Sequence, residues 1–362
     1  MSDTSDTSDT TDTRDTSATS DTRDASDTTG ILDEALERLH TTGPERNGRL
    51  TNHAPMAVEA LVRRGQAPAV HRWLDHYAHK LEELPPAHRP VTADDWREAL
   101  GDPARITDWT HFFARRLDGP EARPWREVLA EWWPRLLPGI AAGSTHPVIR
   151  TGHAVRTLLT GDETAPRRAE LAHALGYWAA RSKPLPPLAP LAPAPSAAAA
   201  LDAVPPVPRQ DGGIRERLAQ LTAFPQWGTA PDPDTAEERL IELVTAATHR
   251  YATHGHGEPI MLVHAATAPN AVLRALPALP RELWVPSLGA AWAAAAAVTA
   301  AYTPRDPLPY KKVVPTAEEV FERAAAHGDD HTIKFTDTAL DVGDPLALAA
   351  AVRSVELNPP VF

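Results

Sequence analysis

The chain contains 362 residues, of which 48 are acidic and 36 are basic, and its formal net charge is −12. Residues 1–30 hold eight aspartates and two arginines, so half of this charge lies there and the rest of the chain carries −6. Because that remainder has no basic excess to neutralise phosphates, we expect no nucleic-acid partner. The sequence has no cysteine, which excludes thiol catalysis, disulfides, cysteine-type zinc sites and iron–sulfur clusters.

The N-terminal segment, residues 1–30, is rich in serine, threonine and aspartate and has almost no apolar side chains. It cannot bury enough surface to offset the entropy of ordering it, so we predict a disordered tail. It also lacks the basic region and the apolar core of a secretory signal, so we expect a cytoplasmic protein.

Apolar residues at helical spacing begin after residue 30 and recur throughout the chain. Before residue 183 this pattern predicts helices over 31–39, 56–65, 70–81, 108–117, 125–137, 148–159 and 171–180. After residue 212 it predicts helices over 214–221, 235–251, 259–276, 284–302, 320–326, 332–340 and 346–352. Alternating apolar and polar runs are nearly absent, so we predict an all-α fold.

Two segments need separate interpretation. Residues 183–212 contain nine prolines, which predict a linker or a surface excursion without regular helix. Residues 284–302 form a stretch of 19 residues without a charge. This stretch is mostly alanine, which drives membrane insertion weakly, so we predict a buried helix and no membrane partner.

Sixteen histidines make a metal site the first kind of chemistry to consider. His53 follows Asn52, a good helix N-cap, and would lie in the first helical turn. His146 precedes a proline, and His264 ends an apolar run. His331 and Lys334 are three residues apart, on one helical face. Spacing alone is more typical of core or capping histidines, and Asp329, Asp330 and Lys334 could equally form an exposed charge cluster.

Five motifs in order along the chain resemble those of the questin oxidase-like family. They are Asn52-His-Ala-Pro-Met56, Trp125-Arg-Glu-Val-Leu-Ala-Glu-Trp-Trp-Pro-Arg-Leu-Leu-Pro-Gly139, Thr145-His-Pro-Val-Ile-Arg-Thr-Gly-His-Ala-Val-Arg156, Glu170-Leu-Ala-His-Ala-Leu-Gly-Tyr-Trp-Ala-Ala180 and Asp330-His-Thr-Ile-Lys334. The resemblance covers nearly everything from about residue 31 to residue 355, outside the proline-rich stretch.

This resemblance implies an oxygenase without flavin or nicotinamide. Fungal members of the family open aromatic polyketide rings such as anthraquinones, and one member holds non-heme iron with four histidines and a carboxylated lysine. Carried over by motif, the metal ligands and catalytic residues are His53, His146, His264, His331 and Lys334, with His153 as the rival of His146. The cofactors implied are Fe(II) or another divalent metal, O₂ as cosubstrate and a CO₂-derived carbamate on Lys334.

The chemistry of these residue types agrees with that ligand set. Neutral imidazoles suit Fe(II), and a lysine carbamate offers an anionic oxygen where a cationic ammonium could not bind a metal. Dinucleotide-binding, P-loop and nucleophile-elbow motifs are absent from the sequence. Because the ligands lie on both sides of the proline-rich stretch, such a site predicts one helical domain over 31–362, built around a buried metal, with 183–212 as an excursion.

The substrate of such an enzyme would be a small aromatic, quinone-like molecule. Asn52, Trp132, Trp133, Tyr177 and Trp178 could line a flat pocket for it, although aromatic residues at helical spacing more often form core. Two other functions remain open at this point: a metal-dependent hydrolase that uses the same ligands, and a non-catalytic helical scaffold whose histidines are structural.

Overall fold

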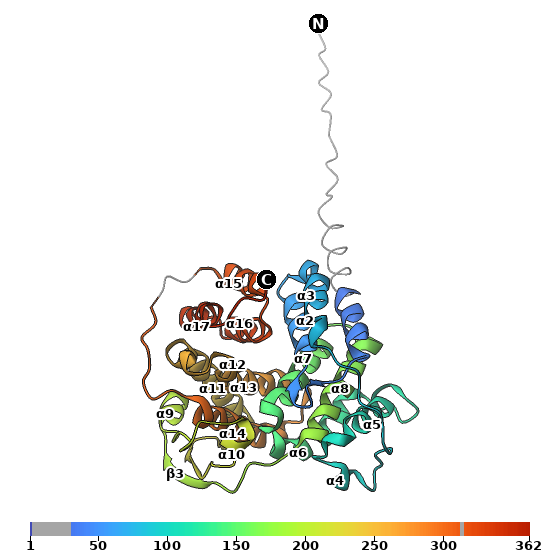
Figure 1. Ribbon diagram of the computed structural model, residues 1–362, viewed down its shortest axis with the longest axis horizontal. Coiled ribbons are helices and arrows are strands. Elements are labelled where there is room, and N and C mark those ends of the chain that lie inside the picture. The colour runs from blue at the N-terminus through green and yellow to red at the C-terminus, as the bar shows by residue number, and fades with distance from the viewer. Residues whose placement is uncertain (2–29, 312–314) are drawn as a thin grey trace.

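Helices make up most of the structure, which confirms the predicted all-α fold (Figure 1). The computed structural model describes residues 1, 30–311 and 315–362. The predicted disordered tail falls almost entirely on residues 2–29, which lie outside the described residues.

The first half of the chain folds into helices close to those predicted. Residues 30–40 are helical. The following helices are α2 (Ala54–Arg63), α3 (Val70–Tyr77), α4 (Trp96–Ala99), α5 (Ile106–Asp118), α6 (Trp125–Leu136), α7 (His146–Thr160) and α8 (Ala165–Arg181). Short 3-10 turns, η1 to η5, join them at Ala67–Ala69, Ala78–Lys80, Pro103–Arg105, Leu137–Gly139 and Ala142–Thr145.

The second half contains the longest helices. They are α9 (Ala197–Asp202), α10 (Ile214–Leu218), α11 (Pro233–His254), α12 (Pro259–Leu262), α13 (His264–Ala275), α14 (Trp284–Tyr302), α15 (Ala317–His327), α16 (Asp330–Val342) and α17 (Pro345–Leu357). Three further 3-10 turns, η6 to η8, cover Gly255–Gly257, Leu276–Ala278 and Arg281–Leu283. The helix predicted over 259–276 is therefore divided at Val263 into α12 and α13.

Two short sheets complete the described structure. Strand β1 (Glu45–Arg46) pairs antiparallel with β2 (Leu50–Thr51), with Glu45 opposite Thr51. Strand β3 (Ala189–Pro193), in the proline-rich segment, pairs in parallel with β4 (Ala223–Gln226).

The prediction that residues 183–212 contain no regular helix is wrong at α9. Helix α9 lies between Pro195 and Pro205, where the sequence is mostly alanine, a strong helix former. Ser196 caps it by accepting a hydrogen bond from the backbone N–H of Ala199. The prolines thus bound a short helix rather than prevent one.

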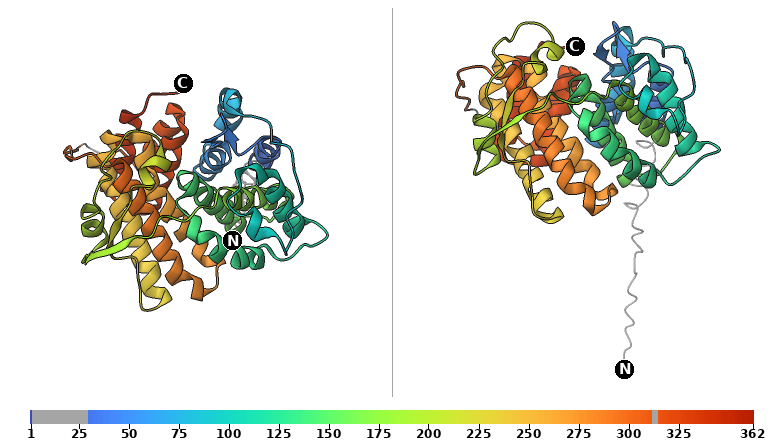
Figure 2. Two further views of the ribbon diagram at one scale, coloured as in Figure 1. Left: turned by 60° about the horizontal axis from the view of Figure 1, so that its bottom comes forward. Right: turned by 90° about the horizontal axis from the view of Figure 1, so that it is seen from below.

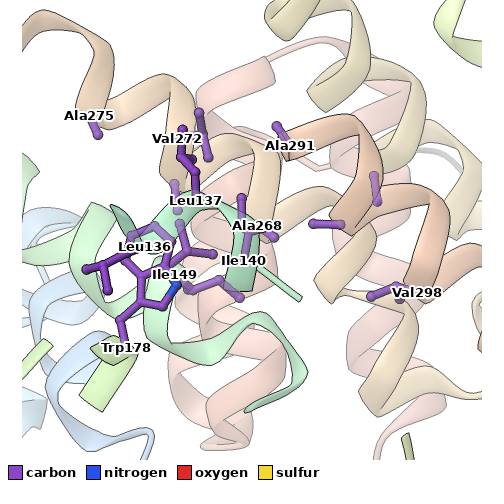
Figure 3. Packing of buried hydrophobic residues seen from close by; sticks show 14 of the residues in the cluster. Leu136, Leu137, Ile140, Ile149, Trp178, Ala268, Val272, Ala275, Ala291 and Val298 are labelled. Atoms are coloured by element: carbon purple, nitrogen blue, oxygen red, sulfur yellow. The ribbon is translucent and has the colours of Figure 1, made fainter. Parts of the chain in front are cut away.

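The two halves of the chain share one hydrophobic cluster. Leu136, Ile149 and Trp178 of the first half lie near Ala268 and Val272 of the second (Figure 3). Two further views show the blue-to-green helices beside the yellow-to-red helices (Figure 2). Helix α14 belongs to this cluster.

Within the described residues, the helical segment Arg281–Tyr302 is long and apolar enough to cross a membrane. However, 67% of its most apolar window is buried inside the protein. This burial fits the predicted core helix.

Helices α2, α7, α13 and α16 form a ring in which each helix runs parallel to its neighbours. For α7 and α13, His146 contacts His264 at the start of both helices, and Gly152 meets Ala271 further along. The other three helix pairs show the same order of contacts. Between α13 and α16 the contacts are His264–His331 and then Arg274–Asp341, and between α16 and α2 they are His53–Asp330 and then Arg64–Asp341. Between α2 and α7 they are His53–His146 and then Glu59–His153. All four N-termini therefore meet at one end of the ring.

Candidate metal centre

Four histidines lie together where these N-termini meet, and we call them the histidine layer: His53, His146, His264 and His331. The ring centroid of His53 lies 4.5 Å from that of His146 and 4.4 Å from that of His331. His264 is 4.5 Å from His146 and 5.5 Å from His331. One ring nitrogen each from His53, His146 and His331 lie within 4.8 Å of one another.

Local sequence places each of these histidines at the start of its helix. The N-cap of α2 is His53 and not Asn52, so the helix begins one residue later than predicted. Asn52 lies just outside the helix, where its side chain accepts a hydrogen bond from the Ala54 N–H. His146 and His264 are the first residues of α7 and α13, and Asp329 caps α16 by accepting from the Thr332 N–H at 2.8 Å.

A left-handed turn precedes His146. Gly143, Ser144 and Thr145 have φ values of 56°, 56° and 65°. This conformation is sterically strained for Ser144 and Thr145, which have a Cβ, but not for glycine. This turn aims the carbonyl of Gly143 at His146 Nδ1, 2.7 Å away. The strain therefore lies where it orients one histidine of the layer.

Each of the four rings has its Nδ1 held by an oxygen acceptor. Carbonyl oxygens of Gly143 and Met261 accept from His146 and His264, at 2.7 and 3.0 Å. Asp330 Oδ1 accepts from His53 and, at 2.8 Å, from His331. Since these oxygens fix the proton on Nδ1, Nε2 is the nitrogen that each ring can offer to a metal.

The shortest approach between two rings supports a metal in this position. His146 Nε2 and His264 Nε2 lie 2.9 Å apart, and with both Nδ1 atoms protonated, two lone pairs face each other. Two imidazole nitrogens bound at right angles about 2.1 Å from one ion are about 3 Å apart. The donor set thus fits a divalent cation better than it fits two unprotonated rings alone.

Burial keeps three of these imidazoles neutral, those of His53, His146 and His264. Desolvation, followed by the nearby Lys334, lowers the pKa of His53 to about 3. The pKa values of His146 and His264 are also far below the usual value, mainly because of burial. Neutral imidazole is the form that binds a metal.

Lys334 lies beside this layer and has no partner for its amine. Its side chain is 2% exposed, and its Nζ finds no hydrogen-bond partner among the described residues. Burial lowers the pKa of Lys334 to about 8, although Asp330 acts in the opposite direction. A buried amine that is partly neutral can react with CO₂, and the resulting carbamate is an anionic oxygen ligand of the kind that completes an Fe(II) site.

Asp330 has a role that the sequence analysis missed. It is 5% exposed, it bridges His53 and His331, and its other oxygen lies 3.6 Å from Lys80 Nζ. The exposed charge cluster considered for Asp330 and Lys334 is therefore wrong, because both side chains are buried. An aspartate directly before a candidate ligand histidine on a helix was the available signal, since carboxylates often orient metal-binding histidines.

His153, the rival of His146, lies in a different layer of the same ring. This charged layer consists of Glu59, His153, Arg156, Arg274, Asp337 and Asp341. His153 Nδ1 donates to Glu59 Oε2 at 2.6 Å. Arg156 donates to both Glu59 and Asp337, the latter at 2.8 Å, so its guanidinium supplies the positive charge between these carboxylates. The structure thus groups His146, and not His153, with the other three candidate ligands.

The residues predicted to line a substrate pocket are all buried. Trp132 packs against Trp109 and Phe113 with centroids 5.4 and 5.1 Å away, and Trp133 packs against Trp178 at 5.3 Å. The hydroxyl of Tyr177 bonds with that of Thr51 at 2.8 Å. Asn52 donates to the carbonyl of Gly43 at 3.1 Å. These contacts give them packing and hydrogen-bonding roles, and their part in substrate binding stays a prediction.

Comparison with known proteins gives one match. The family model described as Questin oxidase-like matches residues 50–338, a range that includes the histidine layer and Lys334. No curated protein and no solved structure matches the chain.

Proposed function

This chain belongs to the Questin oxidase-like family, and from that premise we propose that it is a metal-dependent oxygenase of an aromatic, quinone-like polyketide. The metal would be a single non-heme iron. The histidine layer and a carbamate on Lys334 would hold it, and O₂ would be the cosubstrate.

One observation carries this proposal: four imidazoles converge with every Nδ1 already bonded to an oxygen. Iron in that position would supply the electron transfer by which O₂ reacts with an aromatic ring. The protein supplies the orientation of the ligands, because Asp330 and two backbone carbonyls prevent the rings from turning.

The parallel ring of helices adds an electrostatic contribution. The N-terminal end of a helix carries a partial positive charge, and four such ends meet at the histidine layer. This potential favours anionic groups there, including the carbamate of Lys334 and an ionised oxygen of a quinone-like substrate. We expect the enzyme to act as a soluble, cytoplasmic protein.

Metal analysis of anaerobically purified protein tests the site. We expect about one equivalent of iron in the wild type and loss of it in His264→Ala. His173→Ala is the matched control, because His173 stacks on His40 at 4.5 Å and is not a predicted ligand. Protein without iron, manganese or zinc near one equivalent would contradict the proposal.

Oxygen consumption separates the oxygenase from a hydrolase that uses the same ligands. With a hydroxyanthraquinone as substrate, an oxygenase consumes O₂ in proportion to the product formed. A hydrolase turns its substrate over without consuming O₂.

A further inference from the structure

Two buried polar atoms that lack partners occupy neighbouring helices of the ring. Among the side-chain atoms for which the described residues offer no hydrogen bond are Lys334 Nζ on α16 and Thr267 Oγ1 on α13. The two residues are 2% and 4% exposed. A buried hydroxyl without a partner costs free energy, so an unpaired pair at one place suggests a polar group between them.

The register of α13 and α16 places Thr267 level with Lys334. Above this level His264 contacts His331, with centroids 5.5 Å apart. Below it, Asn270 donates to Thr338 at 3.2 Å, and Arg274 donates to Asp341 at 2.6 Å. These pairs are separated by 67 or 68 positions along the chain. The same separation from residue 267 leads to Lys334.

Lys334 also directs its amine toward this part of the ring. Long side chains on a helix lean toward its N-terminus, here toward His331. His331 lies three residues before Lys334, on the same face of α16, and both side chains are buried. Atoms added to Nζ would therefore extend toward the histidine layer, along the side of the ring that α13 and α16 share.

Thr267 lacks a hydrogen bond that several helical threonines of the protein make. A helical threonine commonly bonds its hydroxyl to the carbonyl four residues earlier. Five do so here: Thr110, Thr151, Thr157, Thr160 and Thr248. The hydroxyl of Thr267 makes no such bond, so it is available to another acceptor.

We propose that the Thr267 hydroxyl donates a hydrogen bond to a carbamate on Lys334 and so positions that group. The carbamate forms when the neutral amine attacks CO₂. A nitrogen–carbon bond forms, one C=O pair becomes an anionic oxygen, and the amine releases a proton to solvent. Thr267 is thus a positioning residue, and this inference rests on the carbamate of the proposed function.

Carbon NMR of protein titrated with ¹³C-bicarbonate tests the inference without measuring activity. The zinc-loaded protein keeps the spectrum free of paramagnetic broadening. Thr267→Val removes the hydroxyl and preserves the shape, and Thr267→Ser restores a donor. Thr151→Val is the matched control, because Thr151 is equally buried in α7 and donates to the carbonyl of Pro147.

A hydrogen bond to a charged group predicts that Thr267→Val needs about ten times more bicarbonate for half of the carbamate signal. Thr267→Ser and Thr151→Val should titrate like the wild type. Equal titration of Thr267→Val and wild type would overturn the role of Thr267 and leave the carbamate intact. Absence of a carbamate signal from every variant, wild type included, would overturn both the role of Thr267 and the carbamate on Lys334.

Discussion

The chemistry of the centre depends on single atoms: which nitrogen of each histidine is free, and whether Lys334 carries a charge or a carbamate. Asp330 shows how one side chain can orient two candidate ligands, because its Oδ1 accepts from both His53 and His331. Replacing such a carboxylate frees two rings at once, which is why groups behind a metal ligand can matter nearly as much as the ligand.

Lys334→Ala distinguishes a ligand from a buried spectator. We expect loss of iron binding and of oxygenation, because the variant removes the anionic donor, and added bicarbonate should not rescue it. Lys334→Glu should restore part of the metal content, since it returns a carboxylate on a shorter side chain. Iron content and turnover are the measurements, and full activity of Lys334→Ala would end the carbamate proposal.

His146 and His153 give a direct comparison on one helix. We expect His146→Ala to lose the metal, because its Nε2 lies 2.9 Å from that of His264. His153→Ala should keep about one equivalent and lose stability instead, because Glu59 then lacks one of its buried donors. Metal analysis and urea unfolding of both variants measure this, and the opposite pattern would make His153 the ligand.

Among the helices, close parallel packing brings the candidate ligands together. At Gly152 of α7, an added Cβ would lie 2.6 Å from Ala271 of α13. These helices carry His146 and His264, so the distance between their axes sets the distance between two candidate ligands.

Gly152→Ala should therefore weaken metal binding as well as the fold. We expect a loss of about 1–3 kcal/mol in the free energy of unfolding, because α7 and α13 must move apart. Gly289→Ala in α14 is the control, because the atom nearest to its added Cβ, the Gly228 carbonyl oxygen, would be 3.3 Å away. That variant should be neutral or gain up to about 1 kcal/mol from helix propensity. Urea unfolding and a metal titration test both, and wild-type behaviour of Gly152→Ala would show that this contact does not set the spacing.

The protein as a whole contains several buried ion pairs in addition to its apolar core. Glu170 of α8 receives two hydrogen bonds from Arg150 of α7, at 2.6 and 2.7 Å, and a third contact from His40 at 3.0 Å. Burial raises the pKa of Glu170, but Arg150 outweighs this, and the result is about 2. The pair connects two helices of the first half in the ionised state.

This pKa predicts the direction of an acid effect on stability. A carboxylate whose folded pKa lies below its unfolded value of about 4.5 stabilises the fold above that pH and loses this contribution as the pH falls toward 2. Between pH 6 and pH 3 we expect Glu170 to account for about 2 kcal/mol of lost stability.

Glu170→Gln should remove this part of the pH dependence and lower the stability at pH 7 by about 3 kcal/mol, because Arg150 stays buried without its charge partner. Exposed Glu322→Gln is the control and should follow the wild type. Urea unfolding from pH 6 to pH 3 measures the difference, and parallel curves for Glu170→Gln and wild type would contradict it.

Local sequence was enough to predict most of the helices, and the family resemblance of its motifs selected the candidate ligands. Apolar spacing depends on residues three and four apart, so it locates α5, α6 and α8 without knowledge of their partners. The motifs around His53, His146 and His331 likewise consist of adjacent residues. The error at α9 arose because composition was averaged over 30 residues, whereas an alanine run of a few residues suffices for a short helix.

The folded structure was needed wherever a property depends on residues far apart in the chain. Grouping His146, and not His153, with His264 depends on the parallel register of α7 and α13, whose contacts join residues 118 to 121 positions apart. The bridge from Asp330 to His53 spans 277 positions. Helical periodicity specifies which face of a helix is buried. It does not specify which helix covers that face, nor the relative height of the two helices along their axes. That height brings four histidines to one level and places Thr267 opposite Lys334.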